Sequence, residues 1–241
     1  MQRRSFLFGC AAAAAAADPL AHAQQAADAQ QLSSAKPRSW PRARLVGADG
    51  RPLEASSIPP RKALVFPYPF VGTPAFLIDL GKPTQRSVSL ETHDEGRYTW
   101  DGGVGPRRSI VAFSAICAHR MAYPTREISF INYRDEPSAV TNRAQVIHCC
   151  SEHSEYDPAA GARVLSGPAR QPLAAIVLQH DTADDSLHAV GTRGGELFDA
   201  FFDQFAMKLA LEHGGAEHRS VGDSTTAVPI ERYCRQLMRC S

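Results

Sequence analysis

Two short stretches of the chain contain the residue types that bind metal ions. The first is CAH at residues 117–119, at the end of the apolar run SIVAFSAIC, and the second is HCCSEHSEYDP at residues 148–158. Read by ligand spacing, they supply a Cys-x-His and a Cys-x-x-His. Two thiolates and two imidazoles are the ligands of a [2Fe–2S] centre with two Cys on one iron and two His on the other. A structural zinc site uses the same set. The four ligands predicted from this spacing are Cys117, His119, Cys150 and His153.

The residues after the second stretch help to decide between a [2Fe–2S] centre and a zinc site. The sequence continues with SEYD at residues 154–157 and GPA at residues 167–169. These elements resemble the Rieske family, in which Ser-x-Tyr/Phe-Asp follows the second ligand pair and a Gly-Pro-Ala-Pro-like loop covers the cluster. The resemblance extends over residues 63–192 and is nearest to periplasmic Rieske proteins, such as the arsenite oxidase small subunit and the iron–sulfur subunit of cytochrome bc complexes.

The resemblance implies one [2Fe–2S] cluster of the Rieske type and roles for two further side chains. In high-potential members a Ser hydroxyl bonds a bridging sulfide and a Tyr hydroxyl bonds a ligand Cys sulfur. Ser154 and Tyr156 hold the matching positions. Each donor stabilises the reduced cluster, so we expect a potential nearer to the cytochrome bc type than to the ferredoxin type. The His ligands are expected to face solvent at the tip.

The spacing in the second stretch departs from the family pattern. The ligand His lies one residue closer to Tyr156 than in the family. A register set by Ser-x-Tyr-Asp puts Cys149 on the ligand Cys and Glu152 on the ligand His, which is poor chemistry for a Rieske iron. The register with Cys150 and His153 keeps four soft or borderline ligands and is the one that we prefer. Cys149 remains the alternative to Cys150.

The remaining cysteines raise the question of disulfides. The loop disulfide of the cytochrome bc type is not expected, because its two positions hold Ala122 and Glu152. Cys234 and Cys240 can form a disulfide in an oxidising compartment. They are too far apart on one continuous helix to bond, so this pairing requires the helix to end between them.

The N-terminus has the features of an export signal. Arg3 and Arg4 precede an apolar stretch from Phe6 to Ala17 and the small-x-small site at residues 21–23, which together resemble a twin-arginine signal peptide over residues 1–23. The alternatives are an ordinary secretory signal and a retained anchor. The apolar stretch is shorter than the roughly 20 residues of a membrane-spanning helix. We therefore expect a periplasmic protein with no stable membrane span.

Three further regions follow the signal. Residues 24–60 lack apolar periodicity and are predicted to be an irregular linker or arm. Residues 61–193 contain short apolar runs separated by Gly and Pro, which predict an all-β Rieske domain of stacked antiparallel sheets with an inserted cluster-binding subdomain. Within this region, the polar, Gly-rich residues 92–108 are predicted to be a connection. In residues 194–241, apolar residues at helical spacing before Gly214 predict an amphipathic helix, followed by a tail with another short helical turn.

The composition limits the choice of partner. The chain of 241 residues is 44% hydrophobic and 21% charged, with a net charge of +1, and nothing in this balance indicates nucleic acid. A Rieske cluster moves single electrons. The predicted partner is therefore a redox protein, such as a cytochrome or an oxidase large subunit, or a quinol.

The predicted function is periplasmic electron transfer, as a subunit or partner of a respiratory or oxidase complex rather than as a stand-alone catalyst. One alternative is the Rieske component of an oxygenase, which carries a long catalytic domain with two His and a carboxylate. Here the short segment after the Rieske region offers only Glu212, His213 and His218 for such a site. The other alternative is a non-redox zinc-binding module.

Overall fold

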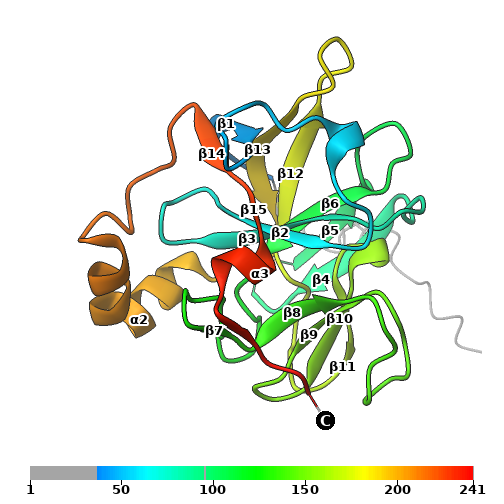
Figure 1. Ribbon diagram of the computed structural model, residues 1–241. Coiled ribbons are helices and arrows are strands. Elements are labelled where there is room, and N and C mark those ends of the chain that lie inside the picture. Colours follow the sequence, from blue (N-terminus) through cyan, green and yellow to red (C-terminus); the bar gives the residue numbers. More distant parts are fainter. Residues whose placement is uncertain (1–36, 95, 241) are drawn as a thin grey trace, which may run out of the picture. The chain divides into compact units, whose positions relative to one another are not determined.

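The larger of two main sheets has eight strands, in the order β14-β1-β13-β12-β6-β3-β2-β15 (Figure 1). The computed structural model describes residues 37–94 and 96–240. The strands of this sheet are β1 (Arg38–Val46), β2 (Ala63–Pro67), β3 (Pro74–Asp79), β6 (Ile110–Ser114), β12 (Ala175–His180), β13 (Leu187–Arg193), β14 (Ser224–Thr226) and β15 (Val228–Pro229). Its two edge strands, β14 and β15, are separated by a single residue, and Thr225 of β14 donates a hydrogen bond of 2.7 Å to the Pro67 carbonyl in β2. The sheet therefore curls until its edges meet.

The central strands of this sheet are buried on both faces. In β3, Ala75 and Leu77 pack in the cluster enclosed by the curled sheet, whereas Phe76 and Ile78 belong to a second cluster. Successive side chains of a strand point to opposite faces, so a strand that is covered on both sides is continuously apolar. This explains the unbroken apolar run that predicted the strand.

A smaller antiparallel sheet lies between β6 and β12 in the chain. Its strands, in the order β11-β10-β9-β8, are β8 (Ile131–Arg134), β9 (Val146–Cys149), β10 (Ser154–Asp157) and β11 (Arg163–Ser166). Ile131, Ile147 and Tyr156 pack against Phe76 and Phe113 of the larger sheet. The predicted all-β class, with stacked antiparallel sheets and an inserted subdomain, is confirmed.

The C-terminal tail returns to the small sheet. Two short two-stranded sheets complete the β structure, formed by β4 (Val88–Thr92) with β5 (Gly96–Trp100) and by β7 (Ile128–Ser129) with β16 (Gln236–Leu237). The pairing of β16 with β7 is parallel, and Met238 N donates a hydrogen bond of 2.9 Å to Ser129 O. Figure 1 shows the red C-terminal segment passing beside β7 and β8. The tail is therefore attached to the inserted subdomain by backbone hydrogen bonds.

The predicted C-terminal helix is α2 (Phe198–His213), and its C-cap Gly214 has a left-handed φ of 62°. The side chains that it buries are Phe198, Phe201, Phe202 and Leu209. The ring of Phe201 meets Tyr123 edge-on, with a centroid separation of 4.9 Å. The helix therefore packs on the β structure beside the loop that follows β6. The short turn expected beyond it is α3 (Ile230–Tyr233).

Two predictions about loops were wrong. The stretch expected to be irregular, residues 24–60, contains β1, which pairs with β13 and β14. Only the C-terminal half of β1 is buried, so its Arg-rich first half shows no alternation. The polar connection after β4 contains β5, whose buried Tyr98 and Trp100 alternate with exposed residues.

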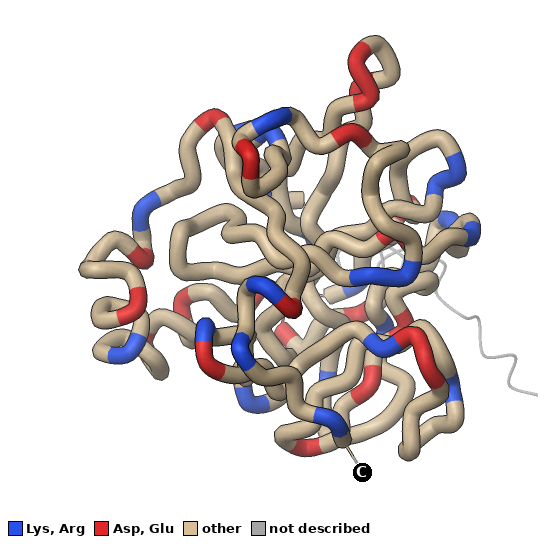
Figure 2. The backbone as a smooth tube through the Cα atoms, in the orientation of Figure 1, with Lys and Arg blue, Asp and Glu red and all other residues tan. Residues whose placement is uncertain are grey.

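The predicted signal peptide lies outside the described residues. No helix within residues 37–94 and 96–240 is long and apolar enough to cross a membrane. Acidic and basic residues are interspersed along the described backbone (Figure 2), in keeping with the net charge of +1.

Candidate metal centre

The first metal-binding stretch forms a tight loop after β6. Cys117 N donates a hydrogen bond of 2.9 Å to Ala122 O, and Met121 N donates one of 2.9 Å to Cys117 O. Met121 adopts a left-handed φ of 56° to close the turn. The loop buries Cys117, which is 1% exposed, and carries the half-buried His119 at its tip.

The second stretch is the hairpin between β9 and β10. Cys149 pairs with Ser154, His148 with Glu155 and Ile147 with Tyr156. Because side chains alternate along a strand, Cys149 and Tyr156 share one face and His148 and Glu155 share the other. We call the face of Ile147, Cys149 and Tyr156, which packs on the larger sheet, the inner face of the small sheet. The face of His148, Cys150 and Glu155 is its outer face.

The sulfur atoms of Cys117 and Cys149 meet at the inner face. The thiol of Cys149 donates a hydrogen bond to the Cys117 sulfur, and this bond is the largest of the effects that lower the pKa of Cys117 to about 6. The Tyr156 hydroxyl lies 3.3 Å from Cys117 Sγ, accepts a hydrogen bond of 3.2 Å from Ala118 N and further lowers the pKa of Cys117. The same hydrogen bond raises the pKa of Cys149, because the Cys149 proton is held between the two sulfurs. The pocket therefore favours negative charge on sulfur.

Backbone amides of both loops also point at these sulfurs. The N–H groups of His119 and Arg120 donate to the Cys117 sulfur, and those of Ser151 and Glu152 donate to the Cys149 sulfur. In each loop the donors lie two and three residues after the cysteine. Each cysteine thus receives two amide donors from its own loop, and such N–H groups stabilise thiolates that bind metal.

His119 follows Cys117 in the first loop, and its imidazole has an unpartnered nitrogen. Its Nδ1 is buried and makes no hydrogen bond to any part of the chain that the structure describes. A buried polar atom without a partner is costly, and a bound metal would satisfy it. His119 also lines a cavity of about 460 Å³, together with Met121, Pro168 and Ala200. The buried sulfurs of Cys117 and Cys149 and the unpartnered Nδ1 of His119 are the donors that these loops offer to a metal, and His119 is reachable from the surface.

The structure contradicts the prediction that Cys150 is a ligand. Its sulfur forms a disulfide with Cys240, 90 residues away in the chain, so it offers no thiolate. Its backbone N–H continues the ladder with a bond of 2.7 Å to Phe130 O, so its side chain lies on the outer face, opposite to that of Cys149. The Cys234–Cys240 disulfide, which the sequence left possible, is not formed, since Cys240 bonds to Cys150 and Cys234 is a buried free thiol.

His153 does not reach the two sulfurs either. It is exposed, has a left-handed φ of 58°, and its ring lies 5.8 Å from that of His148 on the outer face. The turn thus matches the Ser-x-Tyr-Asp register, in which Cys149 holds the ligand position and Glu152 stands in place of the ligand His. Glu152 is 42% exposed and pairs with Arg120, with 3.2 Å between Oε1 and Nε. The two sulfurs that meet at this site are therefore those of Cys117 and Cys149, and the predicted ligands Cys150 and His153 lie on the outer face.

The two side chains expected to tune the centre lie on the inner face. Tyr156 contacts the Cys117 sulfur, as the resemblance implied. Ser154 is fully buried, and its Oγ accepts a hydrogen bond of 3.2 Å from Ala169 N. Gly167 has a φ of +89°, and a Cβ there would lie 2.5 Å from Ser154 Cα. The Gly-Pro-Ala segment therefore packs directly on the second loop, and only glycine permits this approach.

No family model matches the chain. Among solved structures, the chain is similar to the soluble domain of the Rieske protein II (soxF) from Sulfolobus acidocaldarius. The two are 25% identical in sequence, with a TM-score of 0.44, and the match covers 65% of this chain and 82% of that one.

Two pairs of residues on the outer face were not predicted from the sequence: His148 with Glu155, and Cys150 with Cys240. The Nδ1 atom of His148 lies 3.3 Å from Oε1 of Glu155, and both side chains are fully buried. Burial lowers the pKa of His148, so its imidazole is neutral near pH 7. The spacing His148-x-Cys150 on a strand was the available signal, because it places both side chains on one face. The partner Cys240 left no signal in the sequence.

Proposed function

We propose that this chain transfers single electrons through an iron–sulfur centre of the [2Fe–2S] type held between the loops after β6 and β9. The protein ligands are Cys117, His119 and Cys149, with Glu152 as the fourth. The observation that carries the proposal is the meeting of two buried sulfurs, each approached by two amides of its own loop.

The chain's own residues prepare this site for a negatively charged group. The loop amides and the Tyr156 hydroxyl donate to the sulfurs, and these donors cost no reorganisation because strands and tight turns fix them. A bound [2Fe–2S] centre supplies a one-electron couple. The packing of α2 behind Tyr123 holds the first loop in position.

The carboxylate of Glu152 sets this site apart from the Cys2His2 type. To bind metal, Glu152 must exchange its ion pair with Arg120 for the metal, and exposed ion pairs contribute only about 0–1 kcal/mol. A carboxylate adds one negative charge relative to imidazole and lowers the potential. The potential is therefore expected to fall below that of a centre with two His ligands and the same donors.

Export and partner belong to the same proposal. The N-terminal Arg pair and small-x-small site support export to the periplasm by a twin-arginine signal. His119 lines the surface cavity beside α2, so a redox protein or a quinol can approach it there. Electrons would then leave or enter at the His119 side rather than through the larger sheet.

Spectroscopy with metal analysis tests the proposal. The exported protein, purified without oxygen, is expected to contain two iron and two sulfide per chain and to give an electron paramagnetic resonance signal after reduction. Glu152→His should convert the signal to that of a two-His centre and raise the potential, whereas Glu152→Ala should weaken iron binding. Zinc in place of iron and sulfide would contradict electron transfer and support a zinc-binding module.

A further inference from the structure

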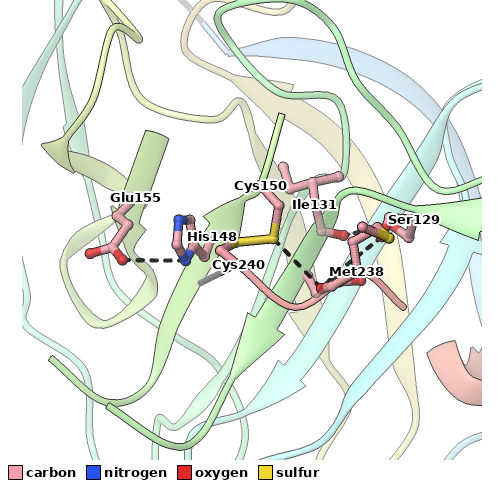
Figure 3. Close-up of a disulfide and its surroundings, with 8 residues drawn as sticks. Ser129, Ile131, His148, Cys150, Glu155, Met238 and Cys240 are labelled. Carbon is pink, nitrogen blue, oxygen red and sulfur yellow. Dashed lines mark hydrogen bonds and ion pairs between the residues drawn. A yellow bond between two sulfur atoms is a disulfide. The ribbon is translucent and has the colours of Figure 1, made fainter. Parts of the chain in front are cut away.

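A second group of metal-binding side chains lies on the outer face of the small sheet. It contains His148, Cys150, His153 and Cys240, and the side chains of His148 and Cys150 lie on the face opposite to that of Cys149. Figure 3 shows the disulfide that joins Cys150, after β9, to the C-terminal tail, with His148 beside it. The group thus includes two cysteines and two histidines from the second loop and the tail.

The ligand atoms of this group are already close together. One ring nitrogen each of His148 and His153 and the sulfur of Cys240 all lie within 4.8 Å of one another, and Cys150 supplies the sulfur bonded to Cys240. Zinc at about 2.0–2.3 Å from each ligand needs these atoms about 3.3–3.8 Å apart. Rotation of the exposed His153 and separation of the two sulfurs provide that geometry.

The environment of His148 independently indicates a ligand. Neither ring nitrogen forms a hydrogen bond with any described residue, although the side chain is fully buried. Nδ1 faces Glu155 Oε1 at 3.3 Å without hydrogen-bond geometry, and Thr141 Oγ1 donates to the other carboxylate oxygen. A small ring rotation completes an Nδ1–H···O bond to Glu155 and leaves Nε2 for a metal. A carboxylate behind a metal-binding histidine is the usual arrangement at zinc sites.

The tail remains attached when the disulfide opens. Met238 N donates to Ser129 O at 2.9 Å, and the side-chain amide of Asn132 donates to Met238 O at 3.1 Å. Arg235 also pairs with Glu127, with 2.9 Å between Nη1 and Oε2. These contacts keep Cys240 beside the small sheet without the sulfur–sulfur bond.

We propose that reduction of the Cys150–Cys240 disulfide creates a tetrahedral Zn²⁺ site formed by Cys150, Cys240, His148 and His153. A dithiol reductant transfers two electrons and two protons, the sulfur–sulfur bond breaks, two thiols form, and the reductant becomes a disulfide. Zn²⁺ then replaces the two thiol protons, which pass to solvent. Two soft sulfurs and two imidazoles in a closed site select zinc over hard cations. The small sheet and the tail are thus joined by a disulfide in the oxidised form and by a metal in the reduced form.

Co²⁺ binding by the full chain tests this proposal, with Co²⁺ as the spectroscopic probe for zinc. The reduced protein, freed of reductant without oxygen, should bind one more equivalent of Co²⁺ than the oxidised protein. The added equivalent should show a thiolate-to-cobalt charge-transfer band and the strong visible bands of tetrahedral Co²⁺. Metal at the Cys117–Cys149 site is common to both forms and cancels in the difference. Zn²⁺ should displace the added Co²⁺ and protect Cys150 and Cys240 from alkylation.

Variants separate this site from the first one. Cys240→Ser and His153→Ala should each abolish the added equivalent, while His213→Ala, a histidine outside both sites, should leave it unchanged. Glu155→Gln should weaken the added equivalent by about 10–100-fold, as expected for a group that orients a ligand. Equal binding by the oxidised and reduced forms, or an unchanged added equivalent in His153→Ala, would overturn the proposal.

Discussion

Cys149 and Cys150 are adjacent in the chain, but their sulfur atoms lie on opposite faces of the small sheet. Cys149 meets Cys117 on the inner face under a set of hydrogen-bond donors. Cys150 bonds to Cys240 on the outer face, beside two histidines. One face is organised to stabilise thiolates, and the other joins the tail to the subdomain.

The difference follows from the twofold period of a strand. A shift of one residue moves a side chain to the opposite face, so the choice between two neighbouring cysteines is a choice between two chemical environments. The same rule groups His148 with Cys150 and separates both from Cys149. Ligand spacing alone contains no information on which face is buried.

The strongest test of the comparison exchanges each cysteine for serine. Cys149→Ser is expected to lose the iron–sulfur centre, because one of its two thiolates is removed. Cys150→Ser is expected to keep it, and iron and sulfide analysis of both purified variants makes the measurement. Loss of the iron–sulfur centre in Cys150→Ser but not in Cys149→Ser would show that Cys150, rather than Cys149, binds the centre.

In its oxidised form, the disulfide on the outer face is expected to stabilise the fold. Cys240→Ser removes the disulfide that closes a loop with a sequence separation of 90, and we expect the free energy of unfolding to fall by about 2–4 kcal/mol. Chemical denaturation without reductant measures this effect. Cys234→Ser, which alters a free thiol, is the matched control. Equal stability of Cys240→Ser and the unaltered chain would show that the hydrogen bonds and ion pair of the tail hold it without the disulfide.

Tyr156→Phe refines the description of the inner face. The hydroxyl donates to the Cys117 sulfur and stabilises the more negative, reduced state, so its removal lowers the potential. A hydrogen bond to a charged sulfur is worth about 1.5 kcal/mol, which corresponds to about 60 mV for one electron. A redox titration monitored by electron paramagnetic resonance measures this shift in the reduction potential. The Tyr133→Phe variant removes a hydroxyl that makes no hydrogen bond to any described residue, so it should leave the potential unchanged.

In the metal-free protein, the ionisation of the Cys117 thiol provides the smallest of the expected effects. The Cys117 thiol has its pKa lowered to about 6, so a thiolate forms as the pH rises through that value, whereas burial raises the pKa of Cys234 to about 12. The ultraviolet absorbance of the thiolate should therefore rise in one step near pH 6. Cys149→Ala removes the main donor and should move this step to higher pH. A step that is unchanged in Cys149→Ala would mean that the two sulfurs do not share a proton.

Much of the fold was predictable because its signals are local. The apolar runs that became β2, β3, β6, β12 and β13 are bounded by Gly and Pro, and the helix shows its spacing and its Gly214 cap within one segment. The strand β5 escaped prediction because Gly-rich turns flank it and only Tyr98 and Trp100 carry its alternation. Strand β1 escaped because half of it is exposed.

For the candidate site too, some features were predictable from the sequence and others were not. The sequence by itself determined that two Cys- and His-containing loops follow two buried strands, and that Ser154 and Tyr156 accompany the second loop. The tertiary structure decided that Cys149 rather than Cys150 meets Cys117, that His153 lies beside His148 on the outer face, and that the tail brings Cys240 back to the small sheet. The physical reason is that these outcomes depend on which face of β9 packs on the core and on a contact between distant segments, neither of which residue spacing encodes.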